Sequence, residues 1–197
     1  MPILTPGMRI GLLGGSFNPP HAAHRAVSQL ALKRLRLDRI WWLVSPGNPL
    51  KDNKKLPPLD GRLERARAIA ADPRIDVTAI EETLGTVFSH DIVAKLRALY
   101  PNVRFVFLMG ADNLAGFHRW KRWRELAFTV PIAVMDRAGL SLTALASPAA
   151  LALMRWRLGE PQAPLLALSK PPAWVFLHGM KSPLSSTAIR AKPKRKG

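Results

Sequence analysis

Two histidines follow a pair of glycines near the start of the chain, and this combination can bind phosphate. The segment reads Gly14-Gly15-Ser16-Phe17-Asn18-Pro19-Pro20-His21-Ala22-Ala23-His24. It joins an apolar run, 9–13, to a stretch with helical spacing, 22–36, which predicts a strand followed by a helix. The start of such a helix offers unpaired N–H groups and a positive dipole end to an anion. His21 and His24 would lie on one side of the first turn, where both could contact one phosphate.

Other readings of this segment are weaker. It is neither G-x-G-x-x-G nor a P-loop, because the Gly-Lys-Ser/Thr ending is missing. A glycine pair alone can be an ordinary turn. A metal site would need further ligands, but the chain has no cysteine and its other three histidines show no ligand spacing: His90, His118 and His178.

A second group of hydroxyl and basic residues stands near the end of the chain. It reads Ser185-Ser186-Thr187-Ala188-Ile189-Arg190. Ser185 and Ser186 are good helix N-cap candidates, and Arg190 adds a fixed positive fork one turn later. Taken alone, this could equally be a common Ser/Thr cap followed by a solvated arginine.

Both segments resemble motifs of the nucleotidylyltransferase superfamily. The first is similar to G-G-[ST]-F-[DN]-P-x-H-x-x-H, with Ala23 where glycine is frequent, and the second to I-S-S-T-x-I-R, with Leu184 in place of isoleucine. The resemblance implies catalytic roles for His21, His24 and Arg190. It implies ATP binding by Gly14, Gly15, Ser16, Phe17, His21, His24, Asp112, Ser185, Ser186, Thr187 and Arg190.

A third segment is similar to a motif of one branch, the bacterial nicotinate-nucleotide adenylyltransferases. Gly110-Ala111-Asp112-Asn113-Leu114 with Phe117 and Trp120 matches G-A-D-N-L-x-x-F-x-x-W. The resemblance implies that Trp120 stacks on the pyridine ring and that Asp112 contacts ribose or adenosine hydroxyls, which suits a flat cation and a hydroxyl donor. Core packing is the alternative for Trp120, because Trp123 lies three residues on.

The loop 45–51 resembles the S-P-x-N-P-x-K loop that binds the mononucleotide phosphate in this branch. The resemblance implies that Asn48 and Lys51 bind that phosphate, and Lys54 or Lys55 could share the role of Lys51. A Pro/Gly turn followed by solvated lysines is the alternative.

The segment 85–91 departs from the pattern G-x-x-Y-T-x-D-T-L of the branch. Phe88 replaces tyrosine, Ser89 replaces threonine and Ile92 replaces threonine. The resemblance implies that Ser89 holds the nicotinate carboxylate through its hydroxyl and the following N–H groups. His90, at a position that is usually small or apolar, could contact the carboxylate or be solvated. Both residues are assigned to mononucleotide binding.

The elements that position these segments form an alternating pattern. Short apolar runs predict strands at 9–13, 39–44, 75–81, 103–109, 130–135 and 173–177, and helical spacing predicts helices at 22–36, 60–72, 89–100, 120–128 and 148–158. Residues 159–172 are predicted to be a long loop. The fold class is α/β, a doubly wound, mostly parallel Rossmann-like sheet with helices on both faces. Each candidate segment follows a strand, so all are expected at one edge of the sheet.

Composition bounds the partners. The 197 residues are 48% hydrophobic and suit a single domain, 1–190, followed by a basic tail, 191–197, which we expect to be mobile. A net charge of +17 favours an anionic partner. No run approaches the ~20 apolar residues of a membrane helix, and no export signal or cysteine is present, so a cytoplasmic protein without membrane association is expected. Neither the composition nor the motifs indicate an oligomeric state.

The resemblance implies adenylyl transfer from ATP to nicotinate mononucleotide in NAD biosynthesis, giving deamido-NAD and pyrophosphate. Mg²⁺ bridging ATP oxygens is the implied cofactor, without an assigned protein ligand. A pantetheine-phosphate, nicotinamide-nucleotide or cytidylyl transferase would share both phosphate motifs. A basic nucleic-acid-binding protein is a further alternative, but the motifs specify a pocket instead of a basic face with interleaved aromatics.

Overall fold

The computed structural model describes residues 4–47, 56–136 and 141–179, and these form a seven-stranded sheet in which every neighbouring pair is parallel. The strand order is β3-β2-β1-β4-β5-β7-β6. The strands are β1 (Arg9–Gly15), β2 (Arg39–Val44), β3 (Ile75–Thr78), β4 (Arg104–Gly110), β5 (Ile132–Met135), β6 (Arg157–Leu158) and β7 (Trp174–Leu177). The predicted doubly wound class is confirmed, and the sheet is parallel throughout.

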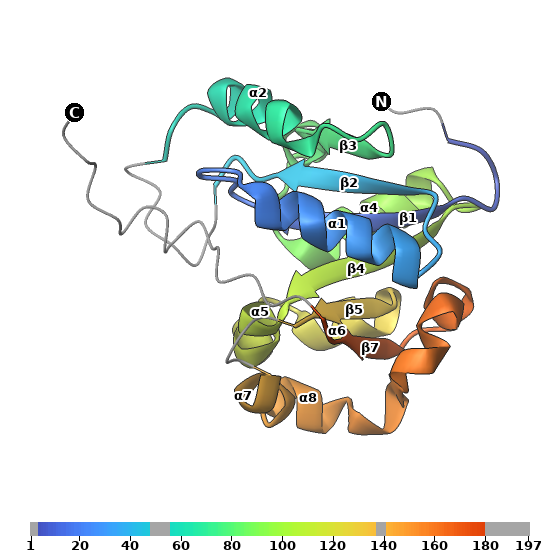
Figure 1. Cartoon of the computed structure of the whole chain (residues 1–197). Helices are drawn as coiled ribbons and strands as arrows, with labels where there is room; N and C mark the ends of the chain where they lie inside the picture. Colours follow the sequence, from blue (N-terminus) through green and yellow to red (C-terminus); the bar gives the residue numbers. More distant parts are fainter. Residues whose placement is uncertain (1–3, 48–55, 137–140, 180–197) are drawn as a thin grey trace.

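Helices cover both faces of the sheet, which explains why its strands are continuous apolar runs (Figure 1). One core contains residues of α1 (Ala22–Arg34), α2 (Leu59–Ala70) and the 3-10 segment η3 (Glu160–Leu168). The other contains residues of α4 (Ser89–Leu99), α5 (Ala111–Gly116), α6 (Trp123–Thr129), α7 (Ser141–Leu145) and α8 (Pro148–Ala152). Strand residues alternate between the two cores, as the pleat requires: Trp41 lies in the second and Trp42 in the first.

Several predicted boundaries are wrong. The predicted strand 75–81 ends at Thr78, and α3 (Ile80–Leu84) follows and ends where Gly85 has a left-handed φ of 62°. Ile80 is buried in α3, and it would be buried in a strand of this sheet as well, so its apolar character could not distinguish a strand from a helix. Pro58 occupies the N-cap of α2, so Asp60 lies in the first turn instead of capping it.

The later part of the chain also differs from the sequence prediction. The segment between the predicted strand 103–109 and the predicted helix 120–128 is mostly helical, as α5 and η1 (Phe117–Arg119), and α6 starts three residues later than predicted. The predicted helix 148–158 ends at Ala152, and η2 (Met154–Trp156) and the short edge strand β6 follow. The predicted loop 159–172 is largely η3, which packs three buried residues against the sheet: Ala163, Leu166 and Ala167. Pro164 inside η3 hides this element from a helix pattern.

The order of the strands places the candidate site. The chain runs outward from β1 to β2 and β3, and then returns to β4 on the other side of β1, so β1 and β4 flank the switch point. Ligands of open α/β sheets bind outside the carboxyl ends of the strands at such a point. The arrows of β2, β4 and β5 point the same way in Figure 1, toward the segments that follow them.

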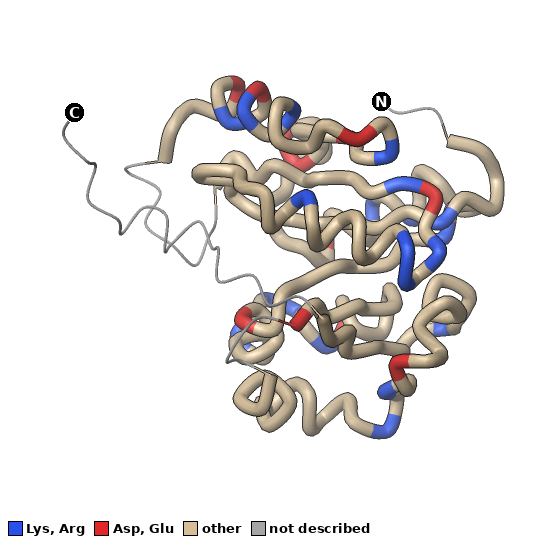
Figure 2. Tube along the Cα trace, viewed as in Figure 1, with Lys and Arg blue, Asp and Glu red and all other residues tan. Residues whose placement is uncertain are grey.

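Lys and Arg residues are spread over many elements of the trace, and Asp and Glu residues are fewer and interspersed among them (Figure 2). Ion pairs join Arg34 to Glu160 and Arg39 to Asp76, with N–O distances of 2.6 Å in both. In the described part of the chain no helix combines the length and apolar character that crossing a bilayer would need.

Candidate active site

The two histidines of the first motif lie together at the start of α1. His21 is the N-cap residue and is 6% exposed, and the centroids of the His21 and His24 rings are 3.9 Å apart. The backbone N–H of His21 donates to Nδ1 of His24 at 3.3 Å. Because Nδ1 accepts this bond, the neutral His24 ring carries its proton on Nε2. His24 therefore presents an N–H donor, which is the group that a phosphate oxygen needs.

Aromatic contacts and hydrogen bonds connect His24 to residues of the core. Its ring centroid lies 4.7 Å from that of Phe17, and Phe17 stacks on Trp42 at 4.9 Å with 22° between the planes. The Trp42 indole N–H donates to Ser28 Oγ at 2.8 Å, and this hydroxyl donates to the backbone carbonyl of His24 at 2.9 Å. The His24 ring thus packs against Phe17, from the connection between β1 and α1, and against Trp42 of β2, while Ser28 ties Trp42 to the backbone of α1.

Gly14 and Gly15 extend β1 beyond its predicted end at residue 13, and their role in ATP binding, like that of Phe17, stays a prediction. Gly14 and Gly15 are the last residues of β1, paired with Leu43 and Val44 of β2. A Cβ on Gly14 would meet open space, so its backbone is accessible from above the strand end. The Phe17 side chain is 1% exposed. Any contact between Phe17 and a nucleotide would therefore go through its backbone.

Asp112 and Trp120 follow β4, the other strand that flanks the switch point. Asp112 lies in the first turn of α5, directly after β4, and is exposed. Trp120 is half-buried, and its ring packs edge-on against Phe117 at 5.4 Å and Phe107 at 6.2 Å. Trp123, by contrast, is 8% exposed and belongs to the core. The structure thus separates a core tryptophan from one with an accessible side.

We expect Trp120→Ala to raise the KM for the pyridine mononucleotide by about one to two orders of magnitude, from ~1–3 kcal/mol of lost stacking. The KM for ATP should change little, and steady-state kinetics with each substrate varied would measure both. Trp156→Ala is the matched control, since Trp156 is a half-buried tryptophan on η2. Equal rises in both KM values, or a large fall in melting temperature, would make Trp120 a core residue instead.

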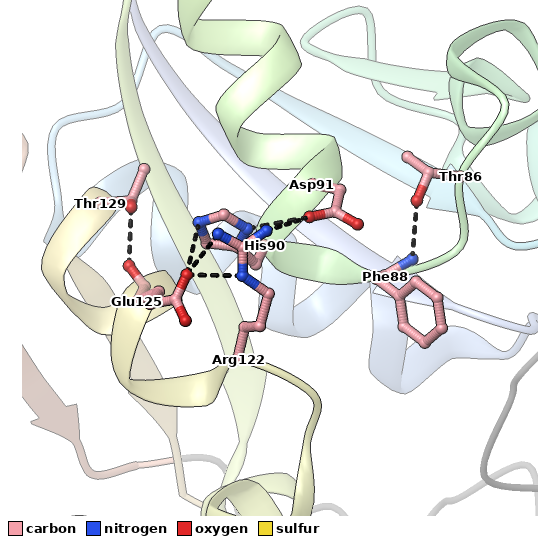
Figure 3. A network of polar contacts seen from close by, with 7 residues as sticks. All are labelled: Thr86, Phe88, His90, Asp91, Arg122, Glu125 and Thr129. Atoms are coloured by element: carbon pink, nitrogen blue, oxygen red, sulfur yellow. Dashed lines mark hydrogen bonds and ion pairs between the residues drawn. The ribbon is translucent and has the colours of Figure 1, made fainter.

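Ser89 begins α4, and a network of polar contacts joins this helix to the segment after Trp120 (Figure 3). Arg122 Nη1 lies 3.1 Å from Asp91 Oδ1, and Arg122 also pairs with Glu125 on α6. These bonds bring the start of α4, where N–H groups can receive a carboxylate, beside the segment that carries Trp120.

His90 belongs to this network. It is buried at 9% exposure, so it is not solvated, and its Nδ1 lies 3.0 Å from Asp91 Oδ1 while Nε2 lies 3.9 Å from Glu125 Oε2. The hydrogen bond with His90, together with the Arg122 charge, lowers the pKa of the Asp91 carboxyl. The contacts of His90 thus join α4 to α6, and its role in mononucleotide binding stays a prediction.

Phe88, the residue that replaces the branch's tyrosine, lies on the other side of Asp91 from His90 and Arg122 (Figure 3). Its backbone N–H donates to Thr86 Oγ1 at 3.3 Å. Lys121 Nζ lies 4.1 Å from the centroid of its ring, a cation–π contact next to Ser89. A positive charge therefore lies over the ring of the residue that precedes Ser89 in the chain.

Sequence reasoning missed two buried charged residues near the strand ends, Arg62 of α2 and Glu81 of α3. They are 1% and 5% exposed. Burial raises the pKa of the Glu81 carboxyl to about 7, while the Ser45 side chain and the Arg62 charge act in the opposite direction. An available signal was the position of Arg62 on the buried face of α2, four residues before the buried Ala66.

Six candidate residues lie outside the described residues: Asn48, Lys51, Ser185, Ser186, Thr187 and Arg190. Lys54, Lys55 and the basic tail lie outside them as well. Within ranges 4–47, 56–136 and 141–179, no group of three or more His, Cys, Asp or Glu could hold a metal ion.

A parallel doubly wound sheet with a histidine pair at the β1–α1 junction, on one flank of its switch point, defines a nucleotide-binding α/β protein. The cytidylyltransferase-like family model matches residues 12–192. A protein of Bradyrhizobium sp. (strain ORS 278), named a probable nicotinate-nucleotide adenylyltransferase, is 57% identical over 93% of this chain and 95% of its own. A protein of Agrobacterium fabrum with the same name is 51% identical over 95% of this chain and 100% of its own. The chain therefore belongs to the cytidylyltransferase-like family and, within it, to the nicotinate-nucleotide adenylyltransferases.

Solved structures share the fold. Plasmodium falciparum nicotinic acid mononucleotide adenylyltransferase complexed with NaAD superposes with a TM-score of 0.69 at 19% identity, over 93% of this chain and 82% of that one. The same enzyme complexed with APC gives a TM-score of 0.67 at 18% identity and the same coverage.

Proposed function

We propose that this chain transfers the adenylyl group of ATP to the 5′-phosphate of nicotinate mononucleotide, giving deamido-NAD and pyrophosphate. The observation that carries the proposal is the placement of the family's histidine pair at the end of β1, beside β4, whose end carries Asp112. Relatives more than half identical to this chain carry the name of this activity.

The reaction needs no covalent intermediate with the protein. An oxygen of the mononucleotide phosphate attacks the α-phosphorus of ATP, a new P–O bond forms, and the bond from that phosphorus to the β-bridging oxygen breaks. Pyrophosphate leaves with the electron pair. The protein has to align two anions and to neutralise the charge that grows on the leaving group.

His21 and His24 supply this neutralisation on the ATP side. At an effective dielectric of about 20, two unit charges 4 Å apart repel by about 4 kcal/mol, so the approach of the two phosphates is costly without nearby donors. The Nε2–H of His24 is oriented for such donation by the bond at its Nδ1. We assign the same task to Arg190, and binding of the incoming phosphate to Asn48 and Lys51.

Mg²⁺ is the expected cofactor. A Mg²⁺ ion carried by the triphosphate would require few protein ligands, which is compatible with described residues that form no cluster of three or more His, Cys, Asp or Glu, and Asp112 stays assigned to hydroxyls of the ribose or adenosine. When bound, the ion offsets charge on the triphosphate. The chain's own residues hold the ribose and the phosphates around it.

The experiment that tests the proposal is an assay of the purified chain with ATP, Mg²⁺ and nicotinate mononucleotide, in which pyrophosphate and the dinucleotide are both quantified. Equimolar formation of the two products is expected. Product from pantetheine phosphate, with none from nicotinate mononucleotide, would assign the chain to another branch.

We expect the acid mononucleotide to be preferred over the amide by about 10- to 100-fold in kcat/KM. A carboxylate can accept bonds from the Ser89 hydroxyl and from N–H groups at the start of α4, whereas the amide would turn its NH₂ toward those donors, a mismatch of about 1–3 kcal/mol. Comparing kcat/KM for the two mononucleotides measures this. Ser89→Ala should narrow the ratio, and equal values for the wild-type protein would refute this role of the loop.

A further inference from the structure

The guanidinium of Arg62 is enclosed at the carboxyl ends of β1 and β2. Arg62 lies in the first turn of α2 and is 1% exposed, on the same face as the buried Leu63 and Ala66. Arginine is almost never fully buried unless its donors are paired. The partners of Arg62 are therefore informative about its role.

All the hydrogen bonds that the structure shows for Arg62 go to backbone carbonyls of loops. Nη1 donates to Ser16 at 2.8 Å and to Ser45 at 2.6 Å. Nη2 donates to Pro46 at 3.3 Å, and Nε donates to Pro57 at 2.9 Å. Ser16 belongs to the loop between β1 and the histidines, and Ser45 and Pro46 follow β2. One side chain thus joins the loop of the ATP phosphates to the loop expected to bind the mononucleotide.

A buried carboxyl accompanies this contact. Glu81 contributes an attractive charge to Arg62, and the Ser45 side chain interacts with the Glu81 carboxyl. Ser45 also donates its hydroxyl to the carbonyl of Gly47 at 2.5 Å. The loop after β2 is consequently bonded to α2 through Arg62, and Glu81 of α3 lies near enough to both to act on them electrostatically.

Stability alone is a poor explanation for this arrangement, because burying a charged group costs several kcal/mol and a packed apolar side chain often does as well. A planar fork with several fixed donors has another property, which is that it sets the distance between the groups it joins. Lysine, with a single ammonium, could not hold both loops in the same geometry.

We propose that Arg62 is a positioning residue for adenylyl transfer, which holds the loop after β1 and the loop after β2 in the register that brings the two phosphates together. The inference rests on the proposed function, because it assigns one substrate phosphate to each loop. Arg62 touches neither substrate and acts through the backbone of Ser16, Ser45 and Pro46. Misplacement of reacting groups by about 1 Å can cost up to 100-fold in rate.

The test compares Arg62→Lys and Arg62→Met with Arg67→Met, an exposed arginine on the same helix. Steady-state kinetics are measured with each substrate varied, at a temperature at which circular dichroism shows every variant fully folded. We expect both Arg62 variants to lower kcat by about tenfold. The KM values for ATP and for nicotinate mononucleotide should both rise at least about threefold, and Arg67→Met should stay within about twofold of the wild type.

Three results would overturn the role. A fall in kcat that disappears when the rate is divided by the titrated concentration of active sites, with both KM values unchanged, would mean that Arg62 only maintains the fraction of competent molecules. A rise in one KM alone would mean that it serves a single loop, and wild-type kinetics in both variants would mean that it serves neither. If Arg62→Met does not fold, Arg62→Lys decides, since it keeps the charge and loses the fork. An inactive wild-type protein would instead count against the proposed function.

Discussion

His24→Ala is expected to lower kcat by about 100-fold or more at saturating substrates, with little change in melting temperature. Because Nδ1 accepts the His21 N–H, Nε2–H is the donor that we assign to the triphosphate, where charge grows as pyrophosphate leaves, so its loss should affect the transition state more than the ground state. His21→Ala should behave similarly, since the two rings are 3.9 Å apart. Steady-state kinetics with thermal melts would measure both effects.

Two further variants sharpen this experiment. His24→Gln keeps an N–H donor at a similar reach and should retain more turnover than His24→Ala. Lys33→Ala, at an exposed position on the same helix, should have wild-type kinetics. A well-folded His24→Ala protein with near-normal kcat at saturating ATP would remove His24 from the catalytic assignment.

Glu81→Gln is expected to make the protein more stable than the wild type at pH 8 by about 3 kcal/mol, but not at pH 4.5. Burial raises the pKa of Glu81 from 4.5 to about 7 in the folded state. Between pH 4.5 and about pH 7 the folded state holds a proton that the unfolded state has lost. The free energy of unfolding of the wild type therefore falls as the pH rises through this range, and it levels off above about pH 7. A neutral glutamine has no such dependence.

Urea unfolding at pH 4.5, 6, 7 and 8 would measure the difference, since the two proteins should diverge progressively over that range. Carboxyls with a lowered pKa, such as Asp91, lose their stabilising effect only at more acidic pH, and they contribute equally to both proteins. Glu82→Gln, at the exposed neighbouring position on α3, should follow the wild-type curve. Parallel curves for the wild type and Glu81→Gln would show that the folded Glu81 titrates at its ordinary pKa.

The sequence by itself determined the architecture and the chemistry of the loops. Apolar runs located six of the seven strands, because helices on both faces leave no polar side to a strand. The histidine spacing placed His21 and His24 on one side of a helix start, which the 3.9 Å ring separation confirms. These features are local, so residue type and spacing were sufficient to predict them.

Only the tertiary structure decided which side chains face the site and which support it. Phe17 lies in the core because its ring stacks on Trp42 of β2. His90 contacts Asp91 and Glu125 because α6 packs beside the start of α4. The burial of Arg62 depends on two backbone carbonyls that are distant in the sequence. Ser16 precedes Arg62 by 46 positions, and Ser45 precedes it by 17. A charged side chain is buried only where distant partners replace its water, and no local pattern records where those partners will be.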